Sequence, residues 1–217
     1  MIINKNTELE AIKKTISKCE KCSLHLTRNN VVPGEGNVDS PLVFIGEGPG
    51  ADEDSSGRPF VGRAGKLLDK MLKDWAGINR NDIYISNIVK CRPPKNRVPT
   101  DDEMKSCIQY LESQMLVIKP KVIVTLGATS MSYFTNKKKI SESRGKFYDW
   151  YGNIKTFVTF HPSYLLRNHS MEKGSPRWYS YMDMRAIGVM FRALQKGKNI
   201  NEVVSAINSR MKESGGI

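Results

Sequence analysis

Four cysteines are the residues of this chain whose type and spacing point most directly to chemistry. Cys19 and Cys22 form a C-x-x-C pair, and Cys91 and Cys107 bracket a basic, proline-rich stretch much later in the chain. Four thiolates are the ligand set of a tetrahedral zinc ion or of a [4Fe–4S] cluster. The spacing leaves the choice between these groups open, and either group would tie the N-terminal arm to a distant loop.

Three further residues have the chemistry to hold a planar ring. Phe60 stands between Pro59 and Val61 just before a predicted helix, where a rigid aromatic ring can stack on a ligand. Asn87 ends an apolar run, and its amide offers a donor and an acceptor to one edge of a pyrimidine. His161 follows another apolar run, at a position where catalytic groups gather in α/β proteins.

Each of these residues also has a structural interpretation. Phe60 would be a hydrophobic staple for the next helix, Asn87 would cap its own turn, and His161 would be a lone structural histidine. The G-E-G-P-G loop at residues 46–50 directs several backbone amides toward a ligand, but a plain turn needs the same glycines. This loop matches neither a Walker A loop nor a G-x-G-x-x-G fingerprint.

The elements that must position these residues follow from the hydrophobic pattern. Nearly continuous Val, Ile and Phe predict buried parallel strands over residues 42–46, 83–89, 121–126 and 156–160. Helical periodicity predicts helices over residues 7–17, 62–75, 101–118, 127–134, 176–195 and 201–211. The alternation predicts one three-layer α/β/α domain over residues 1–217, with a parallel, four-stranded sheet. Its core spans about residues 19–195, and residues 197–217 form a C-terminal helix and tail.

The predicted topology brings the chemical motifs together. Ligands of open parallel sheets bind at the carboxyl ends of the strands. The loop 46–50 follows the first predicted strand, Asn87 lies near the end of the second, and His161 follows the fourth. Loops that are distant in the sequence are therefore predicted to meet at one crevice.

The composition favours an anionic partner. The chain carries 34 Lys and Arg against 22 Asp and Glu, a net charge of +12, which is typical of nucleic-acid binders, with general solubility as the alternative. No apolar run reaches the roughly 20 residues of a membrane span, and the N-terminus lacks a signal-peptide core. We therefore expect a cytoplasmic protein, in which reducing conditions favour metal ligation over disulfides.

The motifs together resemble the family 4 uracil-DNA glycosylases, which are the iron–sulfur enzymes of that superfamily. The resemblance rests on the cysteine spacing and on residues 46–50, 57–65, 87–94 and 161–167. It implies an enzyme that hydrolyses the N-glycosidic bond of deoxyuridine in DNA, releases uracil, leaves an abasic site and starts base-excision repair. It also implies that the four cysteines hold a [4Fe–4S] cluster, with zinc as the less favoured alternative.

The resemblance assigns two catalytic roles. His161 would donate to uracil O2, where negative charge accumulates as the glycosidic bond breaks, so that it acts mainly on the transition state. Glu47 would orient the attacking water or stabilise the sugar cation, and Glu53 is the second candidate for this role.

The same resemblance describes how uracil would be held. The base would leave the DNA stack and lie on Phe60. Asn87 would hydrogen-bond to one edge of uracil and reject cytosine, whose exocyclic amine has the opposite hydrogen-bonding polarity. Backbone amides around Gly48 would line the remaining edge. The expected uracil pocket comprises Glu47, Gly48, Pro49, Glu53, Phe60, Asn87 and His161.

The loop after His161 is expected to enter the duplex where the base has left, because an apolar wedge with a cation suits that task. The alternative is that Leu165 and Leu166 belong to the core. Basic side chains, several of them between Cys91 and Cys107, would contact phosphates. The predicted DNA contacts are Arg58, Arg63, Arg92, Lys95, Arg97, Ser163, Leu165, Leu166 and Arg167.

Three other classes of protein fit the sequence less well. The main alternative is a catalytically silent iron–sulfur DNA-binding module, and the joint presence of Phe60, Asn87 and His161 argues against it. A redox protein would need a flavin, haem or nicotinamide motif, and the sequence contains none. A relative that cross-links to DNA would need a histidine between Cys91 and Cys107, and this segment has no histidine. We expect a monomer whose C-terminal region is a candidate site for a repair or replication partner.

Overall fold

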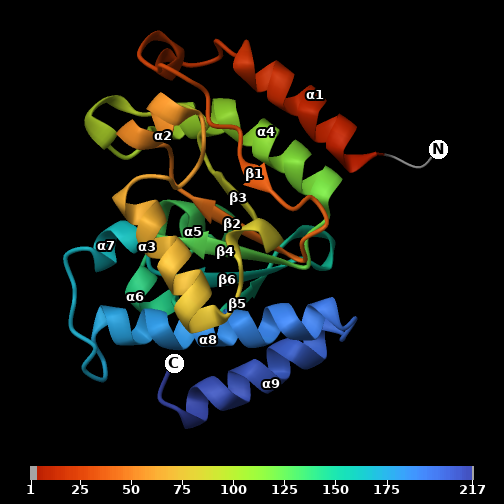
Figure 1. Ribbon diagram of the computed structural model, residues 1–217, viewed down its shortest axis with the longest axis vertical. Coiled ribbons are helices and arrows are strands. Elements are labelled where there is room, and N and C mark those ends of the chain that lie inside the picture. Colours follow the sequence, from red (N-terminus) through yellow and green to blue (C-terminus); the bar gives the residue numbers. More distant parts are fainter. Residues whose placement is uncertain (1–3, 217) are drawn as a thin grey trace.

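A six-stranded sheet lies at the centre of the computed structural model, which describes residues 4–216 (Figure 1). The strands are β1 (Glu35–Gly36), β2 (Leu42–Gly46), β3 (Tyr84–Asn87), β4 (Val122–Leu126), β5 (Phe147–Asp149) and β6 (Lys155–Thr159). Their order across the sheet is β1-β3-β2-β4-β6-β5. The four inner strands are parallel, and each edge strand runs antiparallel to its neighbour.

The four inner strands confirm the four predicted strands to within a few residues. The prediction of a purely parallel, four-stranded sheet is wrong, because β1 and β5 add an antiparallel strand at each edge. These edge strands have only two and three residues and are partly exposed. They therefore lack the continuous apolar run that marks a strand covered on both faces.

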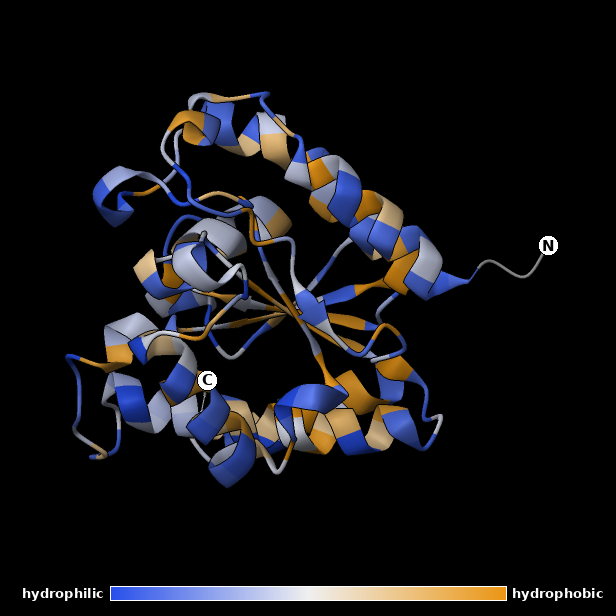
Figure 2. Ribbon diagram, turned by 45° about the horizontal axis from the view of Figure 1, so that its top comes forward, coloured by the Kyte–Doolittle hydropathy of each residue, from blue (hydrophilic) through white to orange (hydrophobic). Residues whose placement is uncertain are grey.

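Helices cover both faces of the sheet, as the side chains of β2 show. Leu42 and Phe44 belong to one buried apolar cluster, whereas Val43 and Ile45 belong to another. Successive side chains of a strand point to opposite faces, so each cluster lies on its own side of the sheet. Figure 2 shows apolar residues gathered along the strands and on the helices beside them. The result is the predicted α/β/α arrangement.

The first face carries the N-terminal helix and two helices of the sheet crossovers. They are α1 (Lys5–Ser17), α4 (Asp101–Ile118) and α5 (Ala128–Thr135). The opposite face is covered by α3 (Arg63–Met71), α7 (Pro162–Leu165), α8 (Pro176–Gln195) and α9 (Ile200–Glu213), the last of which packs on α8. None of the helices within residues 4–216 is long and apolar enough to cross a membrane.

Capping side chains set the starts of the two longest helices. At α4, Thr100 accepts the N–H of Glu103, and the Glu103 carboxylate accepts the N–H of Thr100. At α8, Ser175 accepts the N–H of Trp178, and Pro176 occupies the first helical position. Both helices keep the bounds predicted from the sequence, because the capping residues are local signals.

Other helices depart from the prediction. The helix predicted over residues 62–75 ends at Met71 and continues as a π-helical turn, Leu72–Ala76. The short helices α2 (Ala51–Ser56), α6 (Ile140–Ser143) and α7 were not predicted, because four to six residues show no helical period.

A buried ion pair anchors the last helices to the sheet. Arg144 bonds to Asp183 of α8 and donates to the carbonyl oxygen of Gly216, close to the C-terminus. Asp183 also accepts from Thr159 at the end of β6, at 2.8 Å. Burial raises the pKa of Asp183 to about 6, against the lowering effect of Arg144. The C-terminal segment therefore docks on its own domain.

Candidate active site

A cavity of about 360 Å³ opens at the carboxyl ends of the inner strands. The loops after β2, β3, β4 and β6 all contribute to it. The structure thus places the motifs in one crevice, where the strand topology predicted them. The predicted uracil-pocket residues that line the cavity are Glu47, Gly48, Pro49, Glu53, Phe60, Asn87 and His161.

Phe60 lies in this cavity in an unusual backbone conformation. Its φ is +51°, in the left-handed region that costs a residue with a side chain about 1–2 kcal/mol. The ring is 5% exposed and lies 5.7 Å from the ring of His161, measured between centroids. Phe60 lines the cavity and at the same time belongs to the buried apolar cluster beneath it.

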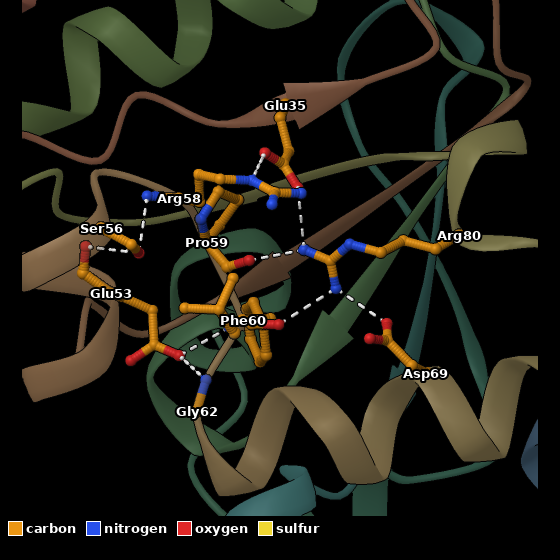
Figure 3. Close-up of polar contacts among 10 residues, drawn as sticks. Glu35, Glu53, Ser56, Arg58, Pro59, Phe60, Gly62, Asp69 and Arg80 are labelled. Atoms are coloured by element: carbon orange, nitrogen blue, oxygen red, sulfur yellow. Dashed lines mark hydrogen bonds and ion pairs between the residues drawn. The ribbon is translucent and has the colours of Figure 1, made fainter.

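An arginine that the sequence analysis did not single out holds this turn (Figure 3). Arg80 donates to the carbonyl oxygens of Pro59 and, at 3.1 Å, of Phe60. Its guanidinium is held in turn by Asp69 at 2.8 Å and by Glu35 at 3.1 Å. These bonds satisfy two carbonyls that the turn removes from regular secondary structure, so Arg80 fixes the position of Phe60.

Gly65 permits the same turn from the other side. A Cβ added at Gly65 would lie 1.9 Å from the carbonyl oxygen of Phe60. Such a distance is far inside van der Waals contact, so only glycine lets α3 approach the turn this closely. The G-R-A-G segment therefore has a packing role that its sequence alone did not reveal.

Glu53 ties two loops of the cavity together. Its carboxylate accepts the N–H groups of Gly50 at 3.0 Å, Val61 at 2.9 Å and Gly62 at 2.8 Å. Figure 3 shows the bond to Gly62. These three bonds occupy the carboxylate with backbone amides. The geometry therefore favours a positioning role for Glu53, and it favours Glu47 over Glu53 as the group that meets water.

Glu47 presents its carboxylate to the cavity and is bonded by Thr129 of α5. The Thr129 hydroxyl donates to the Glu47 carboxylate in a short hydrogen bond. Thr129 lies in the first turn of a helix whose N-terminal dipole favours a nearby negative charge. No sequence signal pointed to Thr129, because it reaches Glu47 only through the pairing of β2 with β4.

Asn87 has an unmatched polar atom in the cavity wall. Its side chain is 1% exposed, and its Oδ1 is buried with no hydrogen-bond partner within the described residues. A Cβ added at Gly46 would lie 2.5 Å from that oxygen and 2.6 Å from Cζ of Phe60. Buried polar atoms are nearly always paired, so an unpaired one in a pocket wall indicates a ligand donor.

His161 is held as a neutral ring. The N–H of Ser163 donates to Nδ1 at 3.1 Å, and the Ser163 hydroxyl lies 2.8 Å from the same nitrogen. Burial lowers the pKa of His161 to about 4, against a smaller opposing effect of Glu53. Because Nδ1 accepts the amide hydrogen, the proton of the neutral ring is on Nε2, which makes Nε2 a donor.

The four cysteines line a second, separate pocket. Cys19 and Cys22 are half-buried on the arm after α1, and Cys91 and Cys107 are buried beside them. All four thiols are free, so no disulfide forms. Within residues 4–216, no group of three or more Cys, His, Asp or Glu side chains is placed so that it could hold a metal ion.

Two donors that the sequence analysis missed face these thiols. Arg28 donates to the sulfur of Cys91 at 3.3 Å, and the N–H of Lys90 donates to the sulfur of Cys107 at 3.3 Å. Burial raises the pKa of Cys91 and raises that of Cys107 to about 11, while Arg28 and Lys90 oppose the shift. These donors favour the thiolate form, which is the form that binds metals.

The predicted DNA contacts fall into two groups. Several basic side chains are engaged within the protein: Arg58 pairs with Glu35 at 2.8 Å, Arg97 pairs with Glu103 at 2.7 Å, and Arg92 donates to Asn96 at 2.8 Å. The others lie exposed on the surface, and they are Arg63, Lys95, Ser163 and Arg167.

The burial of the predicted apolar wedge favours its structural alternative. Leu165 is fully buried in the core between α7 and the sheet, as expected if it belongs to the core, and its contact with DNA stays a prediction. Leu166 is half-buried and packs against the same core. Tyr164 is the large side chain that this helix exposes, at 42%. A four-residue helix turns Leu165 inward and Tyr164 outward, which the residue types alone did not reveal.

Comparisons with known proteins agree with this geometry. A sequence model described as the Uracil DNA glycosylase superfamily matches residues 33–185. The type-4 uracil-DNA glycosylase of Thermotoga maritima is 54% identical over 166 residues, covering 76% of this chain and 86% of that protein. The type-4 enzyme of Saccharolobus solfataricus is 46% identical over 173 residues, covering 76% and 80%. The type-5 enzyme of Pyrobaculum aerophilum is 27% identical, covering 62% and 66%. The chain belongs to the uracil-DNA glycosylase superfamily and, within it, to the type-4 family.

Proposed function

We infer that this protein is a uracil-DNA glycosylase, which hydrolyses the N-glycosidic bond of deoxyuridine in DNA and leaves an abasic site. The observation that carries this inference is the cavity in which Phe60, Asn87 and His161 meet, with Glu47 beside them. One aromatic ring, one buried amide and one neutral histidine are the groups that a flipped pyrimidine needs. The likeness to type-4 enzymes agrees with this assignment.

Asn87 accounts for the choice of uracil over cytosine. Its unpaired Oδ1 accepts the N3–H of uracil, and its Nδ2 group donates to uracil O4. Cytosine presents an acceptor at N3 and an amine at C4, so both contacts would become repulsive. Buried polar groups left unpaired typically cost about 1–3 kcal/mol, which supports strong discrimination from one side chain.

Phe60 supplies the surface on which the base lies. Its ring faces the cavity because of the turn that Arg80, Glu53 and Gly65 hold in place. Stacking of a base on an aromatic ring contributes about 1–3 kcal/mol. The base is thus held by its face and by one edge, which leaves the glycosidic bond directed out of the cavity.

His161 stabilises the charge that appears as the bond breaks. The C1′–N1 electron pair moves onto uracil, and the sugar becomes cationic. The neutral ring donates from Nε2 to uracil O2, which is a neutral carbonyl in the ground state and an anionic oxygen in the transition state. The donor therefore acts mainly on the transition state, which is what accelerates a reaction.

Glu47 directs the water that completes hydrolysis. Its carboxylate is bonded by Thr129, which leaves oxygen lone pairs for a water molecule and for the sugar cation. The water oxygen bonds to C1′, and its proton passes to the carboxylate or to solvent. A late, dissociative transition state needs little help from a base, so orientation and negative charge suffice.

We also propose that Cys19, Cys22, Cys91 and Cys107 hold a [4Fe–4S] cluster. Four free thiols that line one pocket support this proposal. A cubane cluster takes one cysteine on each of its four irons, and the resemblance of the motifs to the iron–sulfur family favours it over zinc. When bound, the cluster would join the N-terminal arm to the 91–107 segment and shape its basic loop.

DNA would bind across the basic surface around the cavity. The net charge of +12 and the exposed Arg63, Lys95 and Arg167 support phosphate contacts there. We propose that the enzyme acts as a monomer in the reducing environment of the cytoplasm, where free cysteines persist. A role for the C-terminal region in partner binding stays a prediction, although α9 itself packs on α8.

The deciding experiment measures uracil release from a uracil-containing oligonucleotide at saturating enzyme, together with binding of the same oligonucleotide. The expected result is release of uracil in a single turnover, with no cleavage of the same oligonucleotide that carries cytosine in place of uracil. Tight binding without uracil release would instead support the catalytically silent DNA-binding module.

A further inference from the structure

We propose that a second groove beside the uracil pocket binds the nucleotide that adjoins uracil in the DNA strand, with Tyr164 stacking on its base. This inference rests on the proposed function, because it assigns a place to the rest of the substrate. The groove has a volume of about 730 Å³ and lies among α6, α7 and the start of α8. These three elements lie side by side in Figure 1.

The groove and the uracil pocket share a wall. Gly127, Ala128 and His161 line both cavities. A uracil that enters the pocket is still joined to the DNA backbone, so its neighbouring nucleotides must lie against the rim of that pocket. A DNA strand whose backbone leaves the pocket over His161 would therefore enter this groove directly.

The groove is lined by aromatic rings that suit an unstacked base. Phe160 forms its floor and is 8% exposed, and Tyr164 rises beside it with 42% of its surface exposed. Their ring centroids are 5.3 Å apart at an angle of 45°. An exposed aromatic ring above an apolar floor is the arrangement by which proteins stack single-stranded bases.

The spacing along α7 fits one nucleotide step. His161 caps α7, and Tyr164 stands three residues later on the same helix. Three helical residues advance about 4.5 Å along the axis, which is the scale of one step along a DNA strand. The residue that meets uracil and the residue that would meet its neighbour are therefore positioned by one rigid turn.

The charges of the groove also suit a phosphate. Lys146 lines the groove and donates to the carbonyl oxygen of Glu142 at 2.8 Å, which leaves it further N–H groups. The Glu142 carboxylate is itself paired with Lys139 at 3.0 Å. Arg144 is neutralised by the buried Asp183. Lys146 thus remains as the cation available to the backbone phosphate.

The test uses single-stranded oligonucleotides in which the base on the 5′ or the 3′ side of uracil is replaced by an abasic analogue. The enzyme concentration that gives half the maximal single-turnover rate is measured for each. With the wild-type protein, removal of the base on one side is expected to raise this concentration about tenfold. Tyr164→Ala should raise the half-maximal enzyme concentration by the same factor on the intact oligonucleotide. With this variant, the abasic analogue should cause no further increase.

Two matched variants separate stacking from other effects of the substitution. Tyr164→Phe keeps the ring and should behave as the wild type. Tyr151→Ala removes another exposed tyrosine, 77% exposed and outside both cavities, and should leave the dependence on the flanking base intact. Melting temperatures of all variants verify that they are folded.

Two results would overturn the inference. One is a wild-type protein that is indifferent to removal of either flanking base while it still releases uracil. The other is a Tyr164→Ala protein in which removal of the flanking base raises the half-maximal enzyme concentration by the same factor as in the wild type. The two changes would then act independently, which means that the ring and the base do not touch. If no oligonucleotide releases uracil, the proposed function itself fails.

Discussion

The guanidinium of Arg80 donates to the carbonyl oxygen of Phe60 at 3.1 Å, and this contact holds the turn whose aromatic ring lines the candidate active site. Arg80 comes from the segment before β3, whereas Phe60 comes from the turn before α3. The two segments meet where α3 packs against the sheet, in the apolar cluster that its side chains share with β3. The position of Phe60 in the cavity therefore depends on a side chain that does not itself line the cavity.

Arg80→Gln is predicted to loosen the turn and let Phe60 leave its left-handed conformation. The single-turnover rate should fall about 10- to 100-fold, because misplacement near 1 Å can cost about 10²-fold, and free uracil should inhibit more weakly. Arg192→Gln is the control, since Arg192 donates to the carbonyl oxygen of Ala76 at 2.9 Å away from the cavity. Equal rates for the two variants at matched stability would refute the positioning role.

Gly65→Ala is predicted to disrupt the same turn by crowding. The new Cβ would lie 1.9 Å from the carbonyl oxygen of Phe60, so either α3 or the turn must shift. We expect a loss of about 1–3 kcal/mol in the free energy of unfolding, typical of overpacking, together with weaker uracil binding. Gly152→Ala has no atom within 4 Å of its added Cβ, although its φ is +65°, so it measures the backbone cost alone. A Gly65→Ala protein no less stable than Gly152→Ala would contradict the close approach.

His161→Ala is predicted to lower the single-turnover rate about 10²- to 10³-fold, as the loss of one transition-state donor does, with DNA affinity nearly unchanged. Glu47→Ala should cost less if the carboxylate only orients water, and as much if it also stabilises the sugar cation. Rates at saturating enzyme and binding curves are compared. Normal cleavage by His161→Ala, or a defect confined to DNA binding, would remove its proposed role.

The pH dependence follows from the pKa of His161, which burial lowers from 6.5 to about 4. The ring stays neutral in the folded protein, so the rate should show no step near pH 6.5. Below pH 6.5 the His161 ring of the unfolded chain becomes protonated, whereas the ring of the folded protein stays neutral down to about pH 4. The free energy of unfolding should therefore fall across this window as the pH is lowered, and His161→Ala should fall less. Denaturant titrations at several pH values measure the difference.

Asn87→Asp is predicted to weaken uracil recognition by about 1–3 kcal/mol, because a carboxylate cannot donate to uracil O4. The loss should appear in uracil excision while binding of uracil-free DNA is unchanged, since phosphate contacts are made elsewhere. Phe60→Ala should also weaken excision, through the loss of stacking. Wild-type excision rates for both variants would show that the pocket is assigned wrongly.

Protein purified without oxygen is predicted to be brown, with broad absorption near about 400 nm from thiolate-to-iron charge transfer, and to contain iron without stoichiometric zinc. Cys91→Ser should lose iron and lower the melting temperature more than it alters the chemistry of any folded fraction. Ser106→Ala, which changes a neighbour in the same pocket, should retain iron. Stoichiometric zinc in natively expressed protein would overturn the cluster proposal.

The sequence by itself determined the parts of this protein that depend on local signals. The inner strands are nearly continuous apolar runs, and α4 and α8 begin at capping residues, so their positions could be predicted. The motif residues also met at the predicted edge of the sheet, because the carboxyl ends of parallel strands share one edge.

Only the tertiary structure decided the rest. The pairing of β1 with β3, the Arg80 contact with Phe60 and the Thr129 contact with Glu47 each join segments at least 20 residues apart in the chain. Whether Leu165 or Tyr164 faces the solvent depends on how one short helix packs on the sheet. Such pairings depend on the packing of whole elements, and the residue types along a single segment carry no record of them.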